Sequence, residues 1–234
     1  VYLKPSYVRN RIRAAVEQPL DLGKLRDRLD ILRSDPNIAR LNAELRPGDT
    51  AGESELDVMI AEAQRFTASV AFNNHRSVSS GAEEFEAFFS ARDLTGYGDA
   101  LNLRYGITQG GFDSMELAGT NDFSIDYTVP ITPHDTTLSF AILRSNDSVV
   151  EEPFADLDID SDSLSLGLTL RHPIYRTPST ELALFASVEY RENETTILGE
   201  NFSFDTGAEN GKSRVFPLRF GQDFSYASPT GAWG

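Results

Sequence analysis

The sequence predicts an α+β unit over residues 1–64, followed by an antiparallel β-sheet of eight strands over residues 65–234. In the first part, apolar residues recur every three or four positions, as on one face of a helix. From Phe66 onward they alternate with polar residues, and a period of two indicates strands with one apolar and one polar face. The connections between these strands also alternate between short and long.

The charge of the chain is concentrated in the predicted sheet. The net charge is −15; residues 1–64 carry 10 basic and 11 acidic residues, and residues 65–234 carry 11 and 25. A nucleic-acid partner would require a basic face, so nucleic acid is excluded as a partner. The chain has no Cys, which removes disulfides, thiolate catalysis and Cys-ligated zinc. It has no apolar run of about 18 residues, so no transmembrane helix is expected.

Two helices are predicted in residues 1–64. Ser6 can cap the first, which ends at Pro19. The second begins near Asp21 and stops at Asp35-Pro36. Their apolar positions are Val8, Ile12 and Val16 in the first helix, and Leu22, Leu25, Leu29 and Leu32 in the second. The charged side chains of the second helix are interpreted as a solvated face.

Two short strands follow these helices. Residues 38–45 alternate, residues 46–52 form a Pro- and Gly-containing turn, and residues 56–60 form the second strand. One face of the first strand carries Ile38, Arg40, Asn42 and Glu44.

The eight strands of the large sheet follow from strict alternation. They are predicted at residues 66–73, 85–92, 101–108, 123–129, 138–142, 164–171, 182–190 and 218–226. The second and third form a hairpin about the turn 93–99, where Gly96 and Gly98 supply backbone freedom and Asp99 can bond locally. The charged residues on the polar face are Arg92, Arg104, Asp126, Arg171, Glu189, Arg219 and Asp223.

The lengths of the connections distinguish between two kinds of barrel. Residues 94–99, 130–135 and 173–180 are short, whereas residues 74–84, 109–122, 145–162 and 191–213 are longer and mostly polar. Short turns at one end and long loops at the other are typical of an outer-membrane β-barrel, in which the seven charged residues would face a water-filled lumen. The alternation alone also fits a soluble antiparallel barrel with its apolar face inward. The loop asymmetry favours the membrane version.

No catalytic or metal-binding constellation is predicted. His75, His134 and His172 lie in or beside connections without metal-ligand spacing. Residues 156–162 resemble a calcium loop faintly, but Ser161 stands where Gly is needed and Gly167 where Glu is needed. There is no phosphate loop and no nucleophile motif, so we expect no enzyme and no cofactor.

Several stretches together resemble the outer-membrane transporters of two-partner secretion, of the haemolysin/filamentous-haemagglutinin secretion-and-activation type. Those similar to the second POTRA domain of that family are Leu3–Ile12, Pro19-Leu20, Leu29–Pro36, Ala43–Gly48 and Gly52–Leu56. Those similar to its first barrel hairpins are Phe72-Asn-Asn74, Gly81 and Asp93–Asp99. The resemblance covers essentially the whole chain.

The resemblance implies that residues 1–64 are a periplasmic POTRA domain lacking its first strand, and that residues 65–234 are the first half of a sixteen-stranded barrel in the outer membrane. It also implies export of a large β-helical partner protein without nucleotide hydrolysis. The POTRA domain would capture this partner by strand addition, with Ile38, Arg40, Asn42 and Glu44 on the candidate edge strand. The chain is then part of a longer protein and would not secrete alone. The family's lock motif Val-Arg-Gly-Tyr/Phe does not occur in it.

Two other interpretations remain. The first is an outer-membrane protein insertase of the same superfamily, which would carry more POTRA domains upstream. The second is a soluble β-domain that binds a ligand and carries a helical appendage. A soluble module would fold in plain buffer, whereas a barrel would require detergent or lipid.

Overall fold

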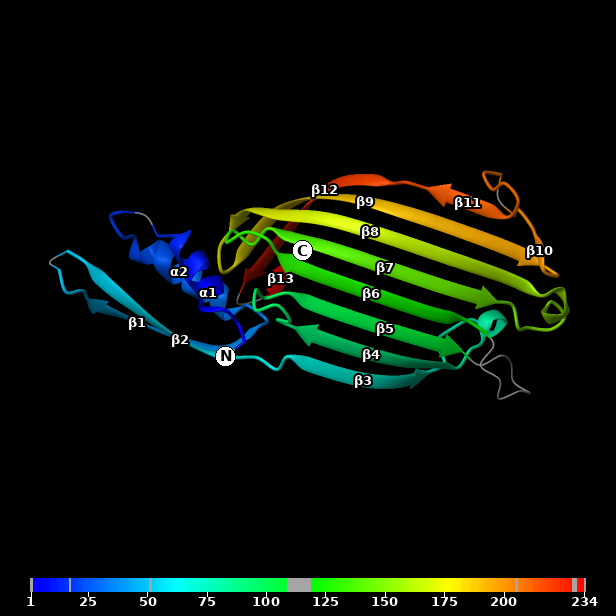
Figure 1. The fold of residues 1–234 in the computed structure, drawn as a ribbon, viewed down its shortest axis with the longest axis horizontal. Coiled ribbons are helices and arrows are strands. Elements are labelled where there is room, and N and C mark those ends of the chain that lie inside the picture. The colour runs from blue at the N-terminus through cyan, green and yellow to red at the C-terminus, as the bar shows by residue number, and fades with distance from the viewer. Residues whose placement is uncertain are drawn as a thin grey trace.

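The computed structural model describes residues 2–16, 18–50, 52–108, 119–204, 206–228 and 231–233. Figure 1 shows two parts, a small unit with both helices and a large curved sheet of long strands. The small unit contains α1 (Pro5–Arg13), α2 (Leu22–Arg33), β1 (Ile38–Pro47) and β2 (Ser54–Glu62). We call it the amino-terminal unit.

The two helices begin in different ways. The second helix begins beside Asp21 as predicted, and the Asp21 carboxylate caps it by accepting hydrogen bonds from the backbone N–H groups of Gly23 and Lys24. The prediction of Ser6 as the cap of α1 is wrong. That helix begins at Pro5, whose fixed φ suits the first helical position, and the Lys4 side chain makes no capping hydrogen bond.

One apolar cluster holds the amino-terminal unit together. Each fully buried aliphatic or aromatic side chain contributes roughly 1.5–3 kcal/mol, so the helices are stabilised mainly by packing on the β1–β2 hairpin. The buried members are Leu3, Tyr7, Val8, Ile12, Leu25, Leu32, Ile38 and Leu41, with Leu29, Ala43, Leu56, Val58 and Ile60 packed against them.

A β-bulge near the start of β1 interrupts the alternation that was predicted for this strand. Ile38 lies opposite Glu62 and Arg40 lies opposite Ala61, so two residues of β1 span one residue of β2. Ile38 therefore joins Leu41 in the core and is 5% exposed. Arg40, Asn42 and Glu44 stay on the exposed face. The placement of Ile38 on the exposed face with them is wrong, because the extra residue reverses its direction.

The large sheet is antiparallel throughout, and its eight long strands pair in sequence order, with a register shift between Pro173 and Tyr175 in the β8–β9 pair. All eight predicted strands are confirmed. They are β3 (Phe66–Asn73), β4 (Glu84–Arg92), β5 (Ala100–Thr108), β6 (Asn121–Pro130), β7 (Thr137–Ser148), β8 (Ile159–Arg176), β9 (Thr180–Ile197) and β12 (Leu218–Ser228). The fold is therefore mostly antiparallel β-sheet with few helices.

The sheet also contains strand segments that alternation did not predict. β8 and β9 each have 18 residues and extend well beyond the predicted ranges. Three short strands add to the edges, namely β10 (Glu200–Asn201), β11 (Lys212–Val215) and β13 (Gly231–Trp233). Two short 3-10 helices, η1 (Val78–Ser80) and η2 (Ala155–Leu157), lie in long connections.

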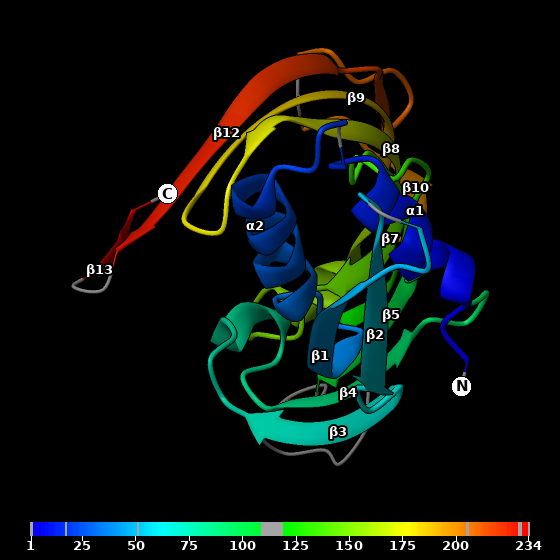
Figure 2. The same ribbon diagram turned by 90° about the vertical axis from the view of Figure 1, so that its left-hand side faces the viewer.

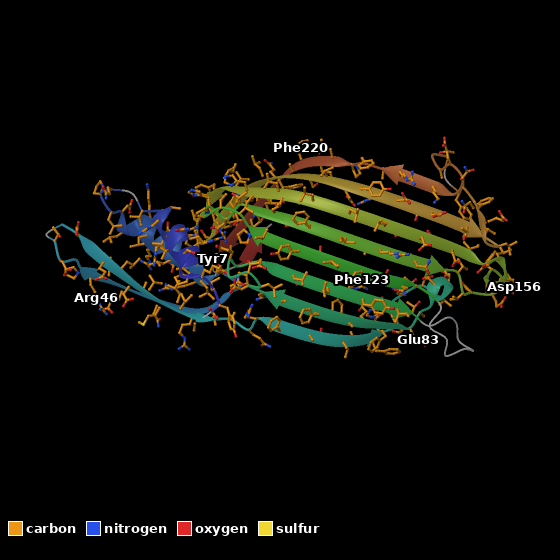
Figure 3. All side chains as sticks on the ribbon, in the orientation of Figure 1. Tyr7, Arg46, Glu83, Phe123, Asp156 and Phe220 are labelled. Carbon is orange, nitrogen blue, oxygen red and sulfur yellow. The ribbon has the colours of Figure 1, made fainter. Side chains whose placement is uncertain are left out.

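The short and long connections lie at opposite ends of the sheet. The turns after β4, β6 and β8 face the amino-terminal unit, and the long connections lie at the far end (Figure 1). Figure 3 places Tyr7 where the helices meet the sheet, and Glu83 and Asp156 at the opposite end. Within the described residues, no helix is long and apolar enough to cross a membrane.

Candidate functional site

The large sheet curves into an open arc, and its two faces differ in chemistry. Figure 2 shows the arc running from β3 around to β12, with α2 in front of the space that it encloses. A cavity of about 730 Å³ lies against the polar face, which is therefore the concave one. Its lining includes Ser124, Asp126, Ser165, Gly167, Thr169 and Glu189.

The convex face is apolar and exposed to the surroundings. Along β8 and its neighbours, Leu168 lies directly between Phe140 and Val188 on this face. The exposed fractions of these three side chains are 36%, 48% and 44%. Similar exposure recurs at Phe66, Val70, Phe72, Phe85, Phe89, Leu166, Leu170, Leu184, Leu218, Phe220 and Phe224. An apolar band of this size on a folded protein marks an interaction surface.

Strand register places the seven predicted lumen residues on one face. Directly opposed residues of an antiparallel pair point to the same side, so the face can be followed from strand to strand. It runs from Asn102 to Asp126 and Ala141, and then to Gly167 and Glu189. The same count puts Arg92, Arg104, Arg171, Arg219 and Asp223 on the concave side.

The structure pairs four of these seven residues with one another. The Arg171 Nε lies 3.0 Å from the Asp223 Oδ2, and the Arg219 Nη1 lies 2.6 Å from the Glu189 Oε2. Asp126 lines the cavity. Arg92 lies at the rim, and its Nη1 donates to the carbonyl of Pro36 at 3.1 Å. Partly exposed ion pairs contribute about 0–1 kcal/mol each to stability. The main effect of these pairs is therefore to neutralise charge on the concave face.

Arg104 belongs to a cluster that sequence reasoning missed. Its guanidinium reaches Glu84 at 3.2 Å, Asp122 at 3.4 Å and also Glu86. Arg76, from the connection after β3, reaches Glu84 at 2.8 Å and also Asp122. The sequence could have revealed Glu84 and Glu86, because residues two apart in a strand point to the same side, and these two lie on the face of Arg92. The position of Arg76 could not be predicted in this way, because side chains in a loop do not alternate between two faces.

The first strand of the amino-terminal unit has an open edge. Within the described residues, β1 pairs with β2 alone. Arg40, Asn42 and Glu44 are exposed, and Glu44 forms an ion pair of 2.7 Å with Arg46. An unpaired row of backbone N–H and C=O groups is a template for another extended chain. Ile38 contributes its side chain to the core instead of to this surface.

The turn 93–99 is built from its own side chains. The Asp99 carboxylate accepts hydrogen bonds from the Thr95 N–H at 2.9 Å and from the hydroxyls of Thr95 and Tyr127 at 2.6 and 3.0 Å. The Asp93 Oδ1 accepts from the Gly98 N–H at 2.9 Å. Although burial acts to raise it, the hydrogen bonds from Thr95 and Tyr127 lower the pKa of Asp99, so the carboxylate stays charged at neutral pH.

This turn is also where the amino-terminal unit meets the sheet. The Lys4 N–H donates to the carbonyl of Gly96 at 2.9 Å, and the Lys4 ammonium lies 3.7 Å from the centre of the Tyr97 ring. The Tyr7 ring lies against Gly98, where a Cβ atom would come within 2.6 Å of it. Burial, followed by the neighbouring Asp35 carboxylate, raises the pKa of Tyr7. Its hydroxyl therefore stays protonated and donates to Asp35 at 2.6 Å.

The described side chains form no cation site. In the part of the chain that the structure describes, no group of three or more His, Asp or Glu residues is arranged to hold a metal ion. His172 makes a hydrogen bond of 2.8 Å with the Thr136 hydroxyl.

Comparison with known proteins is consistent with this arrangement. A family model described as "Haemolysin secretion/activation protein ShlB/FhaC/HecB" matches residues 52–206. The heme/hemopexin transporter protein HuxB of Haemophilus influenzae is 28% identical over 149 residues, which are 63% of this chain and 25% of HuxB. The chain thus spans about a quarter of the length of this curated relative.

Solved structures share the fold at low sequence identity. CdiB from Escherichia coli has a TM-score of 0.71 and 17% identity, over 97% of this chain and 41% of CdiB. BamA from Haemophilus ducreyi lacking POTRA domains 1–3 has a TM-score of 0.58 and 13% identity, over 96% of this chain and 42% of BamA. At such identities the likeness concerns the fold alone.

Proposed function

The chain belongs to the haemolysin secretion/activation protein family ShlB/FhaC/HecB, and we propose that it forms part of an outer-membrane transporter for two-partner secretion. In this proposal residues 1–64 are a periplasmic POTRA domain, the second of the family, without its first strand. Residues 65–234 are the first eight strands of a sixteen-stranded barrel. The fold shared with CdiB and the family match support this division.

The observation that carries the proposal is the direction in which the sheet curves. Its apolar face is convex and exposed, and its polar face encloses the cavity. A soluble barrel would bury the apolar face inward, whereas a membrane barrel turns it toward lipid and encloses water. The curvature therefore supports lipid of the outer membrane as the partner of the convex face.

The concave wall suits the passage of an extended polypeptide. The middle of the wall carries small and hydroxyl side chains such as Ser124, Ser165 and Thr169, and much of its charge is already paired. A passing chain would find few apolar contacts and few free charges to hold it. The partner would be a large secreted β-helical protein, captured first at the β1 edge by strand addition. No nucleotide hydrolysis is needed for these steps.

Deletion of the gene in its source bacterium tests the proposal. We expect one large protein to disappear from the culture medium and cell surface, as measured by mass spectrometry, while other outer-membrane barrels keep their abundance. A general fall in outer-membrane barrels would instead indicate an insertase. An unchanged set of secreted and outer-membrane proteins would overturn both functions.

A proline on the β1 edge tests strand addition. The Gly48 N–H donates to the Glu53 carbonyl, and Pro47, which lacks an N–H, lies opposite Ser54. Hydrogen-bonding positions alternate along a strand, so Leu45 directs its N–H to the free edge. Leu45→Pro should therefore leave the β1–β2 ladder intact but weaken capture of the exported protein, by about 0.5–1.5 kcal/mol for each lost hydrogen bond.

The matched control for this prediction is Leu45→Val, which keeps the N–H and suits a strand. Export is measured for both variants against the unmodified full-length protein. Equal export by Leu45→Pro and Leu45→Val would argue against capture at this edge.

A further inference from the structure

A single carboxylate joins three elements at the junction between the amino-terminal unit and the sheet. Asp135 lies in the turn between β6 and β7, and its side chain is 16% exposed. Its Oδ1 accepts from the Arg11 Nε at 2.9 Å, and its Oδ2 lies 3.0 Å from both the Arg28 Nη1 and the Arg176 Nη1. The three arginines come from α1, α2 and the end of β8.

Two of these arginines are buried in the amino-terminal unit. The side chains of Arg11 and Arg28 are 6% and 10% exposed. The Arg11 guanidinium lies 3.6 Å from the centre of the Tyr7 ring, and the Arg28 Nε donates to the Arg11 carbonyl at 2.9 Å. The Arg28 Nη2 also donates to the carbonyl of Pro133 in the turn at 2.6 Å. Buried guanidinium groups of this kind strongly require a carboxylate partner, and Asp135 supplies it for both.

The third arginine, Arg176, connects the cluster to the concave face of the sheet. The Arg176 Nε lies 2.9 Å from the Glu181 Oε2, and the Glu181 Oε1 lies 2.6 Å from the Arg171 Nη2. Arg171 continues to Asp223 on β12. A chain of ion pairs thus runs from the two helices across the rim of the concave face.

We propose that Asp135 is a positioning residue for export, one that fixes the amino-terminal unit, and with it the β1 edge, over the opening of the sheet. This proposal rests on the proposed function, since positioning matters only if a chain passes from that edge to the concave face. Asp135 itself would not touch the exported chain. It would act through Arg11 and Arg28, which set the orientation of α1 and α2.

The position of the amino-terminal unit can be measured without any partner. Spin labels at Asp49→Cys and Ser179→Cys, both exposed positions of a chain without Cys, report the distance between the β1–β2 turn and the β8–β9 turn. In the full-length protein we expect one narrow distance distribution. Asp135→Asn keeps the size of the side chain, and Asn tolerates the left-handed φ of 61° at this position.

Asp135→Asn is expected to reduce the ratio of docked to undocked molecules by about tenfold or more, because the buried guanidinium groups of Arg11 and Arg28 lose their carboxylate, whereas Arg176 keeps Glu181. Arg28→Gln should act similarly, and the double variant should lose little more than either alone, since both remove the same contact. The matched control is Asp158→Asn, an exposed aspartate with a φ of 45° in the connection between β7 and β8. It should leave the distribution unchanged.

A cross-link separates positioning from a merely structural role. Ser6 and Thr132 line the same crevice of about 160 Å³ between α1 and the turn after β6. A short bismaleimide joining Ser6→Cys to Thr132→Cys should restore export of the protein identified by gene deletion in the Asp135→Asn background.

The outcomes of the experiment separate this inference from the proposed function. An unchanged distance distribution in Asp135→Asn overturns the inference, and so does export that stays lost after cross-linking. If Asp135→Asn fails to assemble into a heat-modifiable barrel, Arg28→Gln decides in its place, because Arg28 lies outside the sheet. If the unmodified protein exports nothing, the proposed function fails. The spin-label distances still show in that case whether Asp135 holds the amino-terminal unit against the sheet.

Discussion

Replacement of Leu168 by arginine is expected to destabilise the protein folded in a bilayer by about 2–4 kcal/mol, the cost measured for arginine facing lipid at mid-depth. Leu168 lies near the middle of the apolar stretch of β8, between Phe140 and Val188 on the convex face. If this face met water, an arginine at a site already 36% exposed would be tolerated with little effect.

The adjacent residue of the same strand provides the control. Thr169 points to the concave side and lines the cavity, so Thr169→Arg should meet water and change stability by less than about 1 kcal/mol. Both variants of the full-length protein are unfolded from lipid vesicles with guanidinium chloride and compared with the unmodified protein. Equal costs for the two variants would contradict the assignment of the convex face to lipid.

Replacement of Gly98 by alanine is expected to separate the amino-terminal unit from the sheet. Gly98 has a φ of +77°, and a Cβ atom there would lie 2.6 Å from the Tyr7 ring. A left-handed alanine costs about 1–2 kcal/mol, and forcing the ring aside adds about 1–3 kcal/mol. The second cost applies to the docked arrangement alone, because the Tyr7 ring belongs to the amino-terminal unit and lies against Gly98 only when the unit is docked.

Gly199→Ala is the matched control for this second prediction. Gly199 has a φ of +75° and no atom within 4 Å of the Cβ position. Alanine there is therefore destabilised by its left-handed backbone conformation but makes no steric clash. The Asp49 and Ser179 spin labels measure docking in both variants. A docked population equal to that of the control would show that the Tyr7–Gly98 contact does not hold the unit.

The alternation of apolar and polar residues was sufficient to locate the long strands and to assign their faces. The alternation located strands best where one face carries apolar residues and the other carries polar ones, as along residues 164–170 of β8. It failed where both faces are polar. Residues 159–163 and 191–197 extend β8 and β9, but Asp160, Asp162 and Glu194 carry no apolar alternation to mark them.

The candidate site divides in the same way. The seven predicted lumen residues followed from spacing alone, because register preserves the face from strand to strand. Their partners outside the seven did not follow: Glu84 and Asp122 bind Arg104, and Glu181 binds Arg171 from the beginning of a neighbouring strand. Ile38 was misplaced because a single extra residue in β1 reverses the pattern without any sign in the sequence.

The sequence by itself thus determined the local elements: the eight strands, their two faces, the start of α2 near Asp21 and the turn 93–99. These depend on contacts between residues near one another in the chain or repeated at a fixed period. Only the tertiary structure decided the direction of curvature and the junction at Asp135. Arg11 and Asp135 are separated by 124 positions, and no local pattern encodes a contact that forms only when the helices pack against the turns of the sheet.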